Sequence, residues 1–294
     1  MEPKKSNVFE CSAVTRWLEI ELTSFCWMKC LVCAREELEK HQFLDFEGFI
    51  KIVDLLEEWN YTEVMVCGLW DAFIHPEVND FMDYLFNRLP KINLFFMTKW
   101  LALKDFHLNK MKELKSRWYN VSLTFSVFSL QKEMYNYLTW WDFYDNFISV
   151  LNKAHKLKIN YSMEFMLSVL TLKELDKFKK FANSLWKDYW ISLVHNWWGK
   201  ISEWVHKKLF DKDILKWHYI ERWEWDICEV MKYDYLYIDS KSWVFQCSLN
   251  EIDRIGYLWQ LGDYTLQEFL EKKRNVNYKK ACENCFYYKY KTFN

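Results

Sequence analysis

The sequence predicts an α/β protein: a partial (β/α)6 TIM-like barrel followed by a small, cysteine-rich C-terminal domain. Six strand-like segments alternate with helix-like segments over residues 17–195, and this order favours a parallel sheet with right-handed crossovers. Six such units over about 180 residues fit a partial barrel better than a closed eight-unit barrel of about 250 residues. After residue 196 the periodicity is lost, and four cysteines mark the second domain.

The six expected strands are short runs in which apolar residues alternate with polar ones or follow one another. They cover residues 17–23, 63–67, 92–98, 121–127, 158–166 and 191–195. The fourth strand carries Ser and Thr at alternate positions. Chemistry in parallel α/β folds lies at the carboxyl ends of the strands, so the loop after the first strand is expected at the functional end of the barrel.

Five helices are expected because apolar residues recur at helical spacing in the segments between these strands. They cover residues 47–59, 77–88, 109–116, 143–155 and 172–185. Pro76 precedes the second of them, as proline commonly does at a helix start. Each helix follows one of the first five strands, which is the order that a parallel sheet requires.

The predicted domain boundary lies between residues 200 and 201, which gives a barrel over 1–200 and a second domain over 201–294. In the second domain, residues 233–238 and 244–247 are expected to form a hairpin, and residues 265–273 a helix. A unit of this size buries little core of its own, and such units usually need a metal or disulfides.

Composition limits the classes of function. The net charge of −1 offers no basic patch for nucleic acid. No run approaches the roughly 18 apolar residues of a membrane span, and the first ten residues contain no apolar core of a signal peptide. The chain is therefore expected to be cytoplasmic and soluble, without nucleic-acid or membrane partners. Nine cysteines in such a chain indicate metal or redox chemistry before disulfides.

Three of these cysteines, Cys26, Cys30 and Cys33, follow the first strand with the spacing Cys-x3-Cys-x2-Cys. Three thiolates on one short loop can hold three corners of an iron–sulfur cubane and leave its fourth iron open for another ligand. A structural zinc ion is the alternative, with His41 as a fourth ligand. Cys11 and Cys67 stand alone and are expected to be ordinary small apolar residues.

The other four cysteines, Cys228, Cys247, Cys282 and Cys285, lie in the predicted second domain. They form a complete ligand set for one closed 4Fe–4S cluster. A structural zinc ion with four cysteines fits the count equally well, and spacing alone favours zinc.

Glycine and tryptophan occur in abnormal numbers: 5 glycines and 18 tryptophans. Average usage of about 7% would give roughly 20 glycines in a chain of this length. Several tryptophans also stand where glycine is expected, as in the turn around Trp243 and after the strand that ends before Trp100. We hypothesise that many of these residues are encoded by UGA codons that the organism reads as glycine. Trp27 and Trp70 belong to the same suspect set.

Four segments together resemble radical S-adenosylmethionine (SAM) enzymes with a C-terminal auxiliary-cluster domain of the SPASM or twitch type. They are E-L-T-S-F-C-W-M-K-C-L-V-C, G-L-W-D-A-F-I-H-P-E at 68–77, M-T-K-W at 97–100, and the cysteine-rich tail with I-D-S-K-S-W-V-F-Q-C. The resemblance covers about residues 15–290. The chain departs from the family pattern at Leu69 and Trp70, where two glycines are usual, and at Asp71, where glutamate is usual.

The resemblance implies a site and a reaction. Cys26, Cys30 and Cys33 would hold the cluster whose open iron binds SAM. Reductive cleavage of SAM would give a 5′-deoxyadenosyl radical that abstracts hydrogen from the substrate. SAM itself would be bound by the residues Gly68, Leu69, Trp70, Asp71, Thr98 and Ser126.

The resemblance also implies partners and a second cofactor. Cys228, Cys247, Cys282 and Cys285 would hold one auxiliary 4Fe–4S cluster, and a flavodoxin or ferredoxin would donate electrons. A peptide or protein is the expected substrate, with a small molecule or sugar as the alternative. The competing class is a non-catalytic iron–sulfur or zinc protein with an electron-transfer or structural role. About eight irons per chain with SAM cleavage on reduction would indicate the enzyme, whereas four or fewer irons with bound zinc and no SAM cleavage would indicate the non-catalytic protein.

Overall fold

The computed structural model describes residues 17–33, 42–67, 71–194, 209, 236–245, 257–260, 265 and 268. Several sequence predictions fall outside these residues. They are the positions of Cys11, His41, Gly68, Leu69, Trp70, His195, Cys228, Cys247, Cys282 and Cys285, and most of the helix expected at 265–273.

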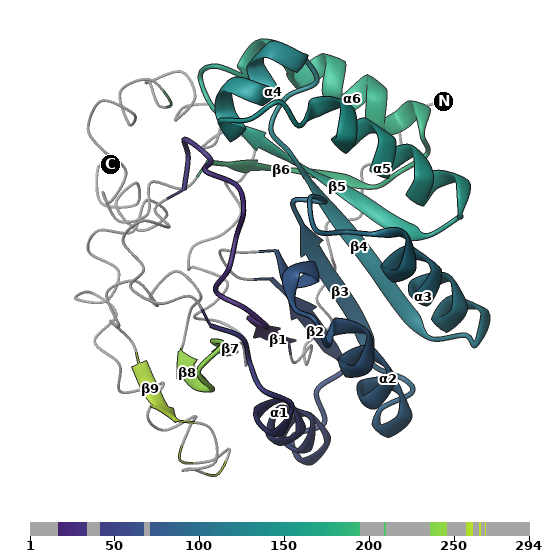
Figure 1. Ribbon diagram of the computed structural model, residues 1–294, viewed down its shortest axis with the longest axis vertical. Coiled ribbons are helices and arrows are strands. Elements are labelled where there is room, and N and C mark those ends of the chain that lie inside the picture. Colours follow the sequence, from purple (N-terminus) through teal and green to yellow (C-terminus); the bar gives the residue numbers. More distant parts are fainter. Residues whose placement is uncertain are drawn as a thin grey trace, which may run out of the picture.

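The described strands form one nine-stranded sheet with the order β6-β5-β4-β3-β2-β1-β7-β8-β9. All neighbours from β1 to β6 are parallel, which confirms the predicted parallel α/β fold. Figure 1 shows helices α1 to α6 arranged along the outer side of this curved sheet. The strands are β1 Trp17–Ile20, β2 Glu63–Val66, β3 Asn93–Thr98, β4 Asn120–Val127, β5 Asn160–Leu167, β6 Tyr189–Leu193, β7 Leu236–Ile238, β8 Trp243–Phe245 and β9 Tyr257–Gln260.

All five predicted helices are present: α1 Phe46–Glu58, α2 Val78–Arg88, α3 Asp105–Ser116, α5 Tyr144–Lys156 and α6 Leu175–Ser184. Helix α3 begins earlier than expected, because the backbone N–H of Lys104 donates to Nδ1 of His107 and caps its first turn. Helix α4, Lys132–Thr139, was not predicted. Two short 3₁₀ turns, η2 Ala72–Ile74 and η3 Leu172–Glu174, complete the elements.

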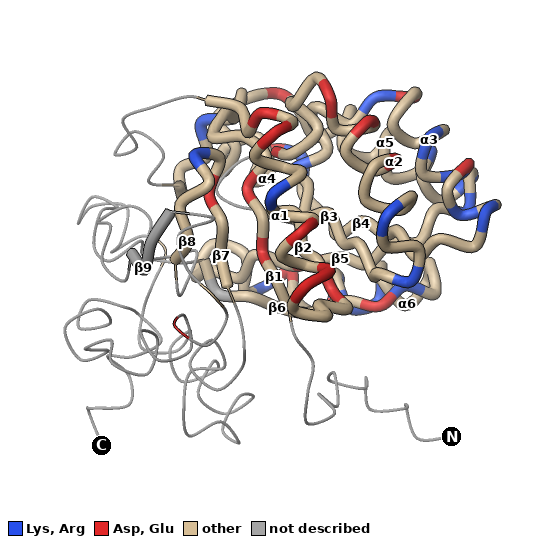
Figure 2. Tube along the Cα trace, turned by 90° about the horizontal axis from the view of Figure 1, so that it is seen from below, with Lys and Arg blue, Asp and Glu red and all other residues tan. Residues whose placement is uncertain are grey.

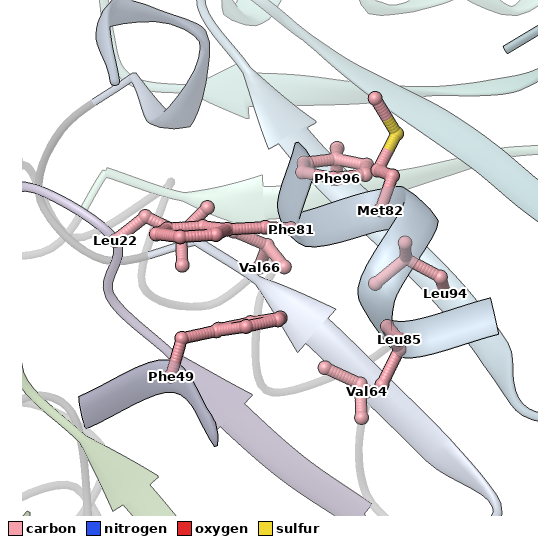
Figure 3. Close-up of a pocket in the computed structure, with 9 residues that line it drawn as sticks. All are labelled: Leu22, Phe49, Val64, Val66, Phe81, Met82, Leu85, Leu94 and Phe96. Carbon is pink, nitrogen blue, oxygen red and sulfur yellow. The ribbon is translucent and has the colours of Figure 1, made fainter. Parts of the chain in front are cut away.

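One face of the parallel sheet packs against the helices and forms the core. Register places Val64, Leu94 and Val121 side by side, and each is almost fully buried. Figure 3 shows Phe49 of α1 and Phe81 of α2 packed over this face. Their rings stack with centroids 4.3 Å apart. The cavity there is only about 10 Å³, barely the space of one water molecule, so it is a packing gap in the core.

The opposite face of the same strands is polar toward their carboxyl ends. The Ser and Thr residues noted at alternate positions of β4 lie on this face, and Ser126 lies beside Glu164 of β5. The hydroxyls of Thr124 and Ser162 lie 3.0 Å apart and hydrogen-bond to each other. Side chains alternate between the faces of a strand, so a polar inner surface lies behind an apolar outer one.

The predicted hairpin exists as β7 and β8, but it continues the main sheet. Strand β7 pairs in parallel with β1, with Leu18 opposite Leu236 and Ile20 opposite Ile238. Strands β8 and β9 follow in antiparallel order. The division into domains at 200/201 stays a prediction, with described strands from both sides of that boundary sharing one sheet.

Glu21 fixes this long-range pairing. Its fully buried carboxylate accepts hydrogen bonds from the Tyr237 hydroxyl at 2.9 Å and from the Ser240 hydroxyl at 2.8 Å. The Ser240 backbone N–H lies 3.3 Å from the same carboxylate. One side chain at the end of β1 therefore holds the far end of β7, more than 200 residues later in the chain.

We expect Glu21→Ala to destabilise the protein by about 2–3 kcal/mol, because buried donors of Tyr237 and Ser240 lose their acceptor. Urea unfolding followed by circular dichroism measures this change. Tyr237→Phe removes one donor, so its effect should be smaller in the Glu21→Ala background than in the wild type. If the two substitutions changed the free energy of unfolding additively, or if Glu21→Ala lowered it by less than ~0.5 kcal/mol, Glu21 would not be the acceptor that holds β7.

Charges of both signs are interspersed along the outer helices (Figure 2). Arg88, for example, donates to Asp54 and to Glu57, joining α2 to α1. Such exposed pairs contribute little to stability. Among the described residues, no helix has both the length and the apolar character needed to span a bilayer.

His107 makes stability depend on pH. Burial and the neighbouring Lys104 lower the pKa of its imidazole to about 4. The unfolded chain takes up a proton near pH 6.5 and the folded chain does not, so folding stability should fall as pH decreases from about 6.5 to about 4. His107→Gln keeps an acceptor for the Lys104 N–H but cannot titrate. Urea unfolding at pH 7 and pH 4.5 should show a smaller acid loss for the variant, and an equal loss would contradict the assignment.

Candidate functional site

The three-cysteine loop leaves the carboxyl end of β1 and is held at its entrance by the returning chain. Backbone N–H groups of Ser24 and Leu44 donate to the carbonyls of Gln42 and Leu22, each at 2.9 Å. The Gln42 N–H donates to the Ser24 hydroxyl at 2.8 Å. These bonds fix the direction of the chain immediately before Cys26.

Buried apolar residues between the cysteines hold the loop against the barrel. Met28 and Val32 are 1% and 6% exposed, and the Leu31 N–H donates to the carbonyl of Leu138 at the end of α4. Cys26, Cys30 and Cys33 alternate with these anchors, are partly exposed, and are thiols rather than disulfides. The loop therefore buries Met28 and Val32 and leaves its three thiols partly exposed.

Cys26 lies where a thiolate needs positive charge. Burial, with smaller contributions from the charges of Asp71 and Cys33, raises the pKa of its thiol to about 11. The Met28 N–H, 3.4 Å from its sulfur, and the ammonium of Lys99 act in the opposite direction. Cys26, Cys33, Asp71 and Lys99 therefore lie close enough to influence one another, which locates the site at the ends of β1, β2 and β3.

Three thiolates on one loop are a donor set that fits an iron–sulfur cubane. In the described part of the chain, no three His, Cys, Asp or Glu side chains are grouped closely enough to hold one metal ion. A cubane takes each thiolate on a different iron, so its ligands need not converge on one point. Cys26, Cys30 and Cys33 would hold it, and the irons would supply the positive charge that the partly buried Cys26 thiolate requires.

Asp71 follows β2 and is fully buried among hydrogen-bond donors. The Thr98 hydroxyl lies 3.2 and 3.1 Å from its two carboxylate oxygens, and the Phe73 N–H donates to it at 3.2 Å. Burial raises the pKa of the Asp71 carboxyl, while these bonds and the charge of Lys99 oppose the rise. The Asp71 carbonyl accepts the Ile74 N–H at 3.0 Å. Asp71 thus shapes the β2–α2 loop and ties it to β3.

His75, in the same loop, is buried and neutral. Its Nδ1 accepts the Glu77 backbone N–H at 3.1 Å, so its Nε2 carries the proton and donates to the Leu44 carbonyl at 2.8 Å. Burial lowers the pKa of this imidazole. His75 therefore joins the β2–α2 loop to the segment that pins the entrance of the cysteine loop.

Thr98 and Ser126, both predicted to contact SAM, lie on opposite faces of the sheet. Thr98 pairs in register with Phe125, the residue before Ser126, and side chains alternate along a strand. Thr98 engages Asp71. Ser126 instead accepts from the Lys99 ammonium at 3.3 Å and lies 3.4 Å from the Glu164 carboxylate. Only Ser126 belongs to the polar inner face.

Sequence reasoning missed Lys99, Glu164 and Glu19. Glu164 occupies on β5 the alternate position that Ser126 occupies on β4, so the polar alternation noted for β4 could have identified it. Glu19 is on the same face at β1 and accepts a hydrogen bond from the Cys67 thiol. Cys67 is buried, in agreement with the small-residue role expected for it.

Comparison with known proteins gives a family model and a set of similar structures. The model of the Radical SAM superfamily matches residues 20–182, more than half of the chain. No curated protein sequence matches.

Three of the similar structures show the same fold at low sequence identity. SuiB of Streptococcus suis bound to S-adenosylmethionine has a TM-score of 0.68 and 11% identity, covering 93% of this chain and 71% of SuiB. SuiB bound to its precursor peptide SuiA has a TM-score of 0.65 and 12% identity, covering 86% of this chain. The native enzyme anSMEcpe with bound AdoMet, which is SAM, has a TM-score of 0.66 and 14% identity, covering 88% and 82%. In the peptide complex, this chain spans 64% of the length of SuiB.

Proposed function

This chain belongs to the radical SAM superfamily, and we propose that it reductively cleaves SAM to a 5′-deoxyadenosyl radical that abstracts hydrogen from a peptide or protein. Members of the superfamily are enzymes that use a 4Fe–4S cluster and SAM, and these cofactors supply the one-electron chemistry. The observation that carries the proposal is the anchored loop that presents Cys26, Cys30 and Cys33 at the carboxyl ends of the strands.

The chain's own residues would position SAM and exclude water. Lys99 brings a positive charge between the cysteine loop and the inner face, where its ammonium contacts Ser126. Ser126 and Glu164 offer a hydroxyl and a carboxylate to the polar groups of SAM. Thr98 would act through Asp71 as a positioning residue, because its hydroxyl already engages that carboxylate. Residues 68–71 would bind the methionine ammonium.

A peptide substrate is supported by one of the compared structures, in which SuiB holds the precursor peptide SuiA. We further propose one auxiliary 4Fe–4S cluster on Cys228, Cys247, Cys282 and Cys285. Strands β7 and β8 lie between Cys228 and Cys247 in the sequence. In the sheet, β7 pairs with β1, and β8 pairs with β7. A flavodoxin or ferredoxin would supply electrons from outside the chain.

The test is SAM cleavage by anaerobically reconstituted protein after reduction with dithionite. We expect 5′-deoxyadenosine and methionine, together with about eight irons per chain, as two 4Fe–4S clusters require. The protein with tryptophan at position 70 and its Trp70→Gly variant are both assayed. A bulky residue at 70 would obstruct the close approach of SAM to the backbone that glycine permits. Iron-loaded protein in which neither chain cleaves SAM would overturn the proposal and favour a non-catalytic iron–sulfur protein.

A further inference from the structure

Tryptophan dominates the left-handed backbone positions of the described chain. Seven non-glycine residues there have positive φ, and four are tryptophan: Trp100 at 64°, Trp118 at 67°, Trp140 at 63° and Trp186 at 54°. Positive φ is uncommon outside glycine, and the usual exceptions are Asn, Asp and His, whereas bulky residues there are outliers. A glycine-poor, tryptophan-rich composition alone does not place tryptophan at these positions.

Two of the four occupy the position after a helix that glycine most often fills. After α3, the Trp118 N–H donates to the Lys115 carbonyl at 3.0 Å and the Tyr119 N–H donates to the Leu114 carbonyl at 3.2 Å. These two bonds define a Schellman motif, whose left-handed residue is usually glycine. Trp118 is that residue.

Helix α6 ends in the same way. The Trp186 N–H donates to the Asn183 carbonyl at 3.0 Å, and the Lys187 N–H donates to the Ala182 carbonyl at 3.2 Å. Helices α1 and α5 provide an internal comparison, because Asn60 and Lys158 hold the corresponding positions with φ of 52° and 56°. Of these four equivalent helix ends, those of α3 and α6 therefore carry tryptophan, the largest side chain, where glycine is usual.

The side chains at three of the four positions contribute little to packing. Trp118 and Trp186 are each 94% exposed, and Trp140, which ends α4, is 62% exposed. Tryptophan normally buries most of its large apolar surface. An indole that is left in solvent on a left-handed residue has neither a packing nor a backbone reason to be there.

Trp100 differs because its indole is buried and its Nε1 donates to the Tyr135 hydroxyl at 2.6 Å. Its backbone is nevertheless left-handed, with φ of 64°, and it is held by a bond from its N–H to the Thr98 hydroxyl at 2.7 Å and by the Leu103 N–H, which donates to its carbonyl. Trp243, in contrast, does not fit the expectation from the sequence. The positive φ of that turn is at Ser242, and Trp243 begins β8.

We infer that the native polypeptide carries glycine at the positions written Trp100, Trp118, Trp140 and Trp186. A gene whose UGA codons mean glycine in its host would give these tryptophans when UGA is read as tryptophan. Among the tryptophans that the structure describes, positive φ thereby singles out these four positions. The backbone gives no such support for glycine at Trp27, because its φ is not positive.

The direct test reads the four codons in the host gene and measures the masses of the peptides that span them in protein isolated from the host. We expect UGA at all four positions, with each peptide lighter by the difference between tryptophan and glycine. UGG at any of the four would overturn the inference for that position, and UGG at all four would overturn it entirely. Neither result depends on SAM cleavage, so this test is independent of the proposed function.

A second test measures the thermal stability of the protein that carries the four tryptophans. Trp118→Gly and Trp186→Gly should each raise the Tm, because glycine relieves the left-handed strain at a helix end. Trp59→Gly is the matched control: Trp59 also follows a helix but has φ of −94° and is buried, so glycine there should lower the Tm. A Tm that falls at Trp118 and Trp186 as it does at Trp59 would overturn the inference.

Discussion

Replacing Cys26 with alanine should abolish reductive SAM cleavage while leaving the fold intact. The partly exposed thiol contributes little to the core, which packs through Met28 and Val32 instead. Mutating even an outer partner of a metal ligand typically costs 10–100-fold in metal affinity or activity, so loss of a ligand should lower the rate more than ~100-fold. Chromatographic detection of 5′-deoxyadenosine measures the rate, and far-ultraviolet circular dichroism checks the fold.

Cys67→Ala is the matched control for this substitution. Cys67 lies at the end of β2, is buried, and bonds to Glu19 rather than belonging to the cysteine loop. We expect it to keep its iron content and its SAM cleavage. Loss of cleavage in Cys67→Ala comparable with that in Cys26→Ala, or cleavage retained by Cys26→Ala, would show that the loop thiols are not the ligands.

Replacing His75 with alanine should destabilise the protein by about 3–5 kcal/mol. The Leu44 carbonyl and the Glu77 N–H would both lose a buried partner, and each such loss costs about 1–3 kcal/mol. The lost imidazole also leaves a gap beside Phe43 and Phe81, whose rings lie 5.2 and 4.6 Å from it. Urea unfolding at pH 7 measures the change in the free energy of unfolding.

His155→Ala serves as its control, because His155 is exposed on α5 and bonds only to the Tyr161 hydroxyl among the contacts described for its ring nitrogens. Exposed substitutions of this kind usually change stability by no more than ~0.5 kcal/mol. A loss for His75→Ala as small as that for His155→Ala would mean that the histidine does not join the two loops.

Local pattern predicted most of the barrel, because each strand and helix there has one face to bury. Strands β2 to β5 lie within a few residues of their expected bounds. Helix α4 escaped prediction because it is only eight residues long and buries only Tyr135, Leu138 and Thr139. An apolar stripe so short is hard to distinguish from a loop that happens to contain aromatic residues.

The pairing of β7 with β1 could not be read from local pattern. It joins residues more than 200 positions apart and depends on the acceptor that Glu21 provides. In the sequence, Glu21 is only one polar residue in an alternating strand. Nothing in that alternation distinguishes a buried carboxylate with three donors from a solvated one.

The sequence predicted the part of the candidate site that lies in one contiguous motif, and it missed residues that separate strands bring together. The loop with Cys26, Cys30 and Cys33 lies after β1, at the end of the barrel expected from the sequence, and its role as a cluster site stays a prediction. Lys99 follows β3 and Glu164 lies on β5, and they meet Ser126 only through the register of three strands. Thr98 and Ser126 were grouped because both end strands, while their side chains leave opposite faces.

The most direct test of the central claim is electron paramagnetic resonance of the reduced cluster before and after addition of SAM. A Cys282→Ala/Cys285→Ala chain is used, so that only the cluster of the Cys26 loop is expected to remain. Binding of SAM to an open iron should change the spectrum of this chain, whereas a chain that also lacks Cys26, Cys30 and Cys33 should give no cluster signal. A cluster spectrum that SAM leaves unchanged, or one that persists without the three loop cysteines, would contradict the account.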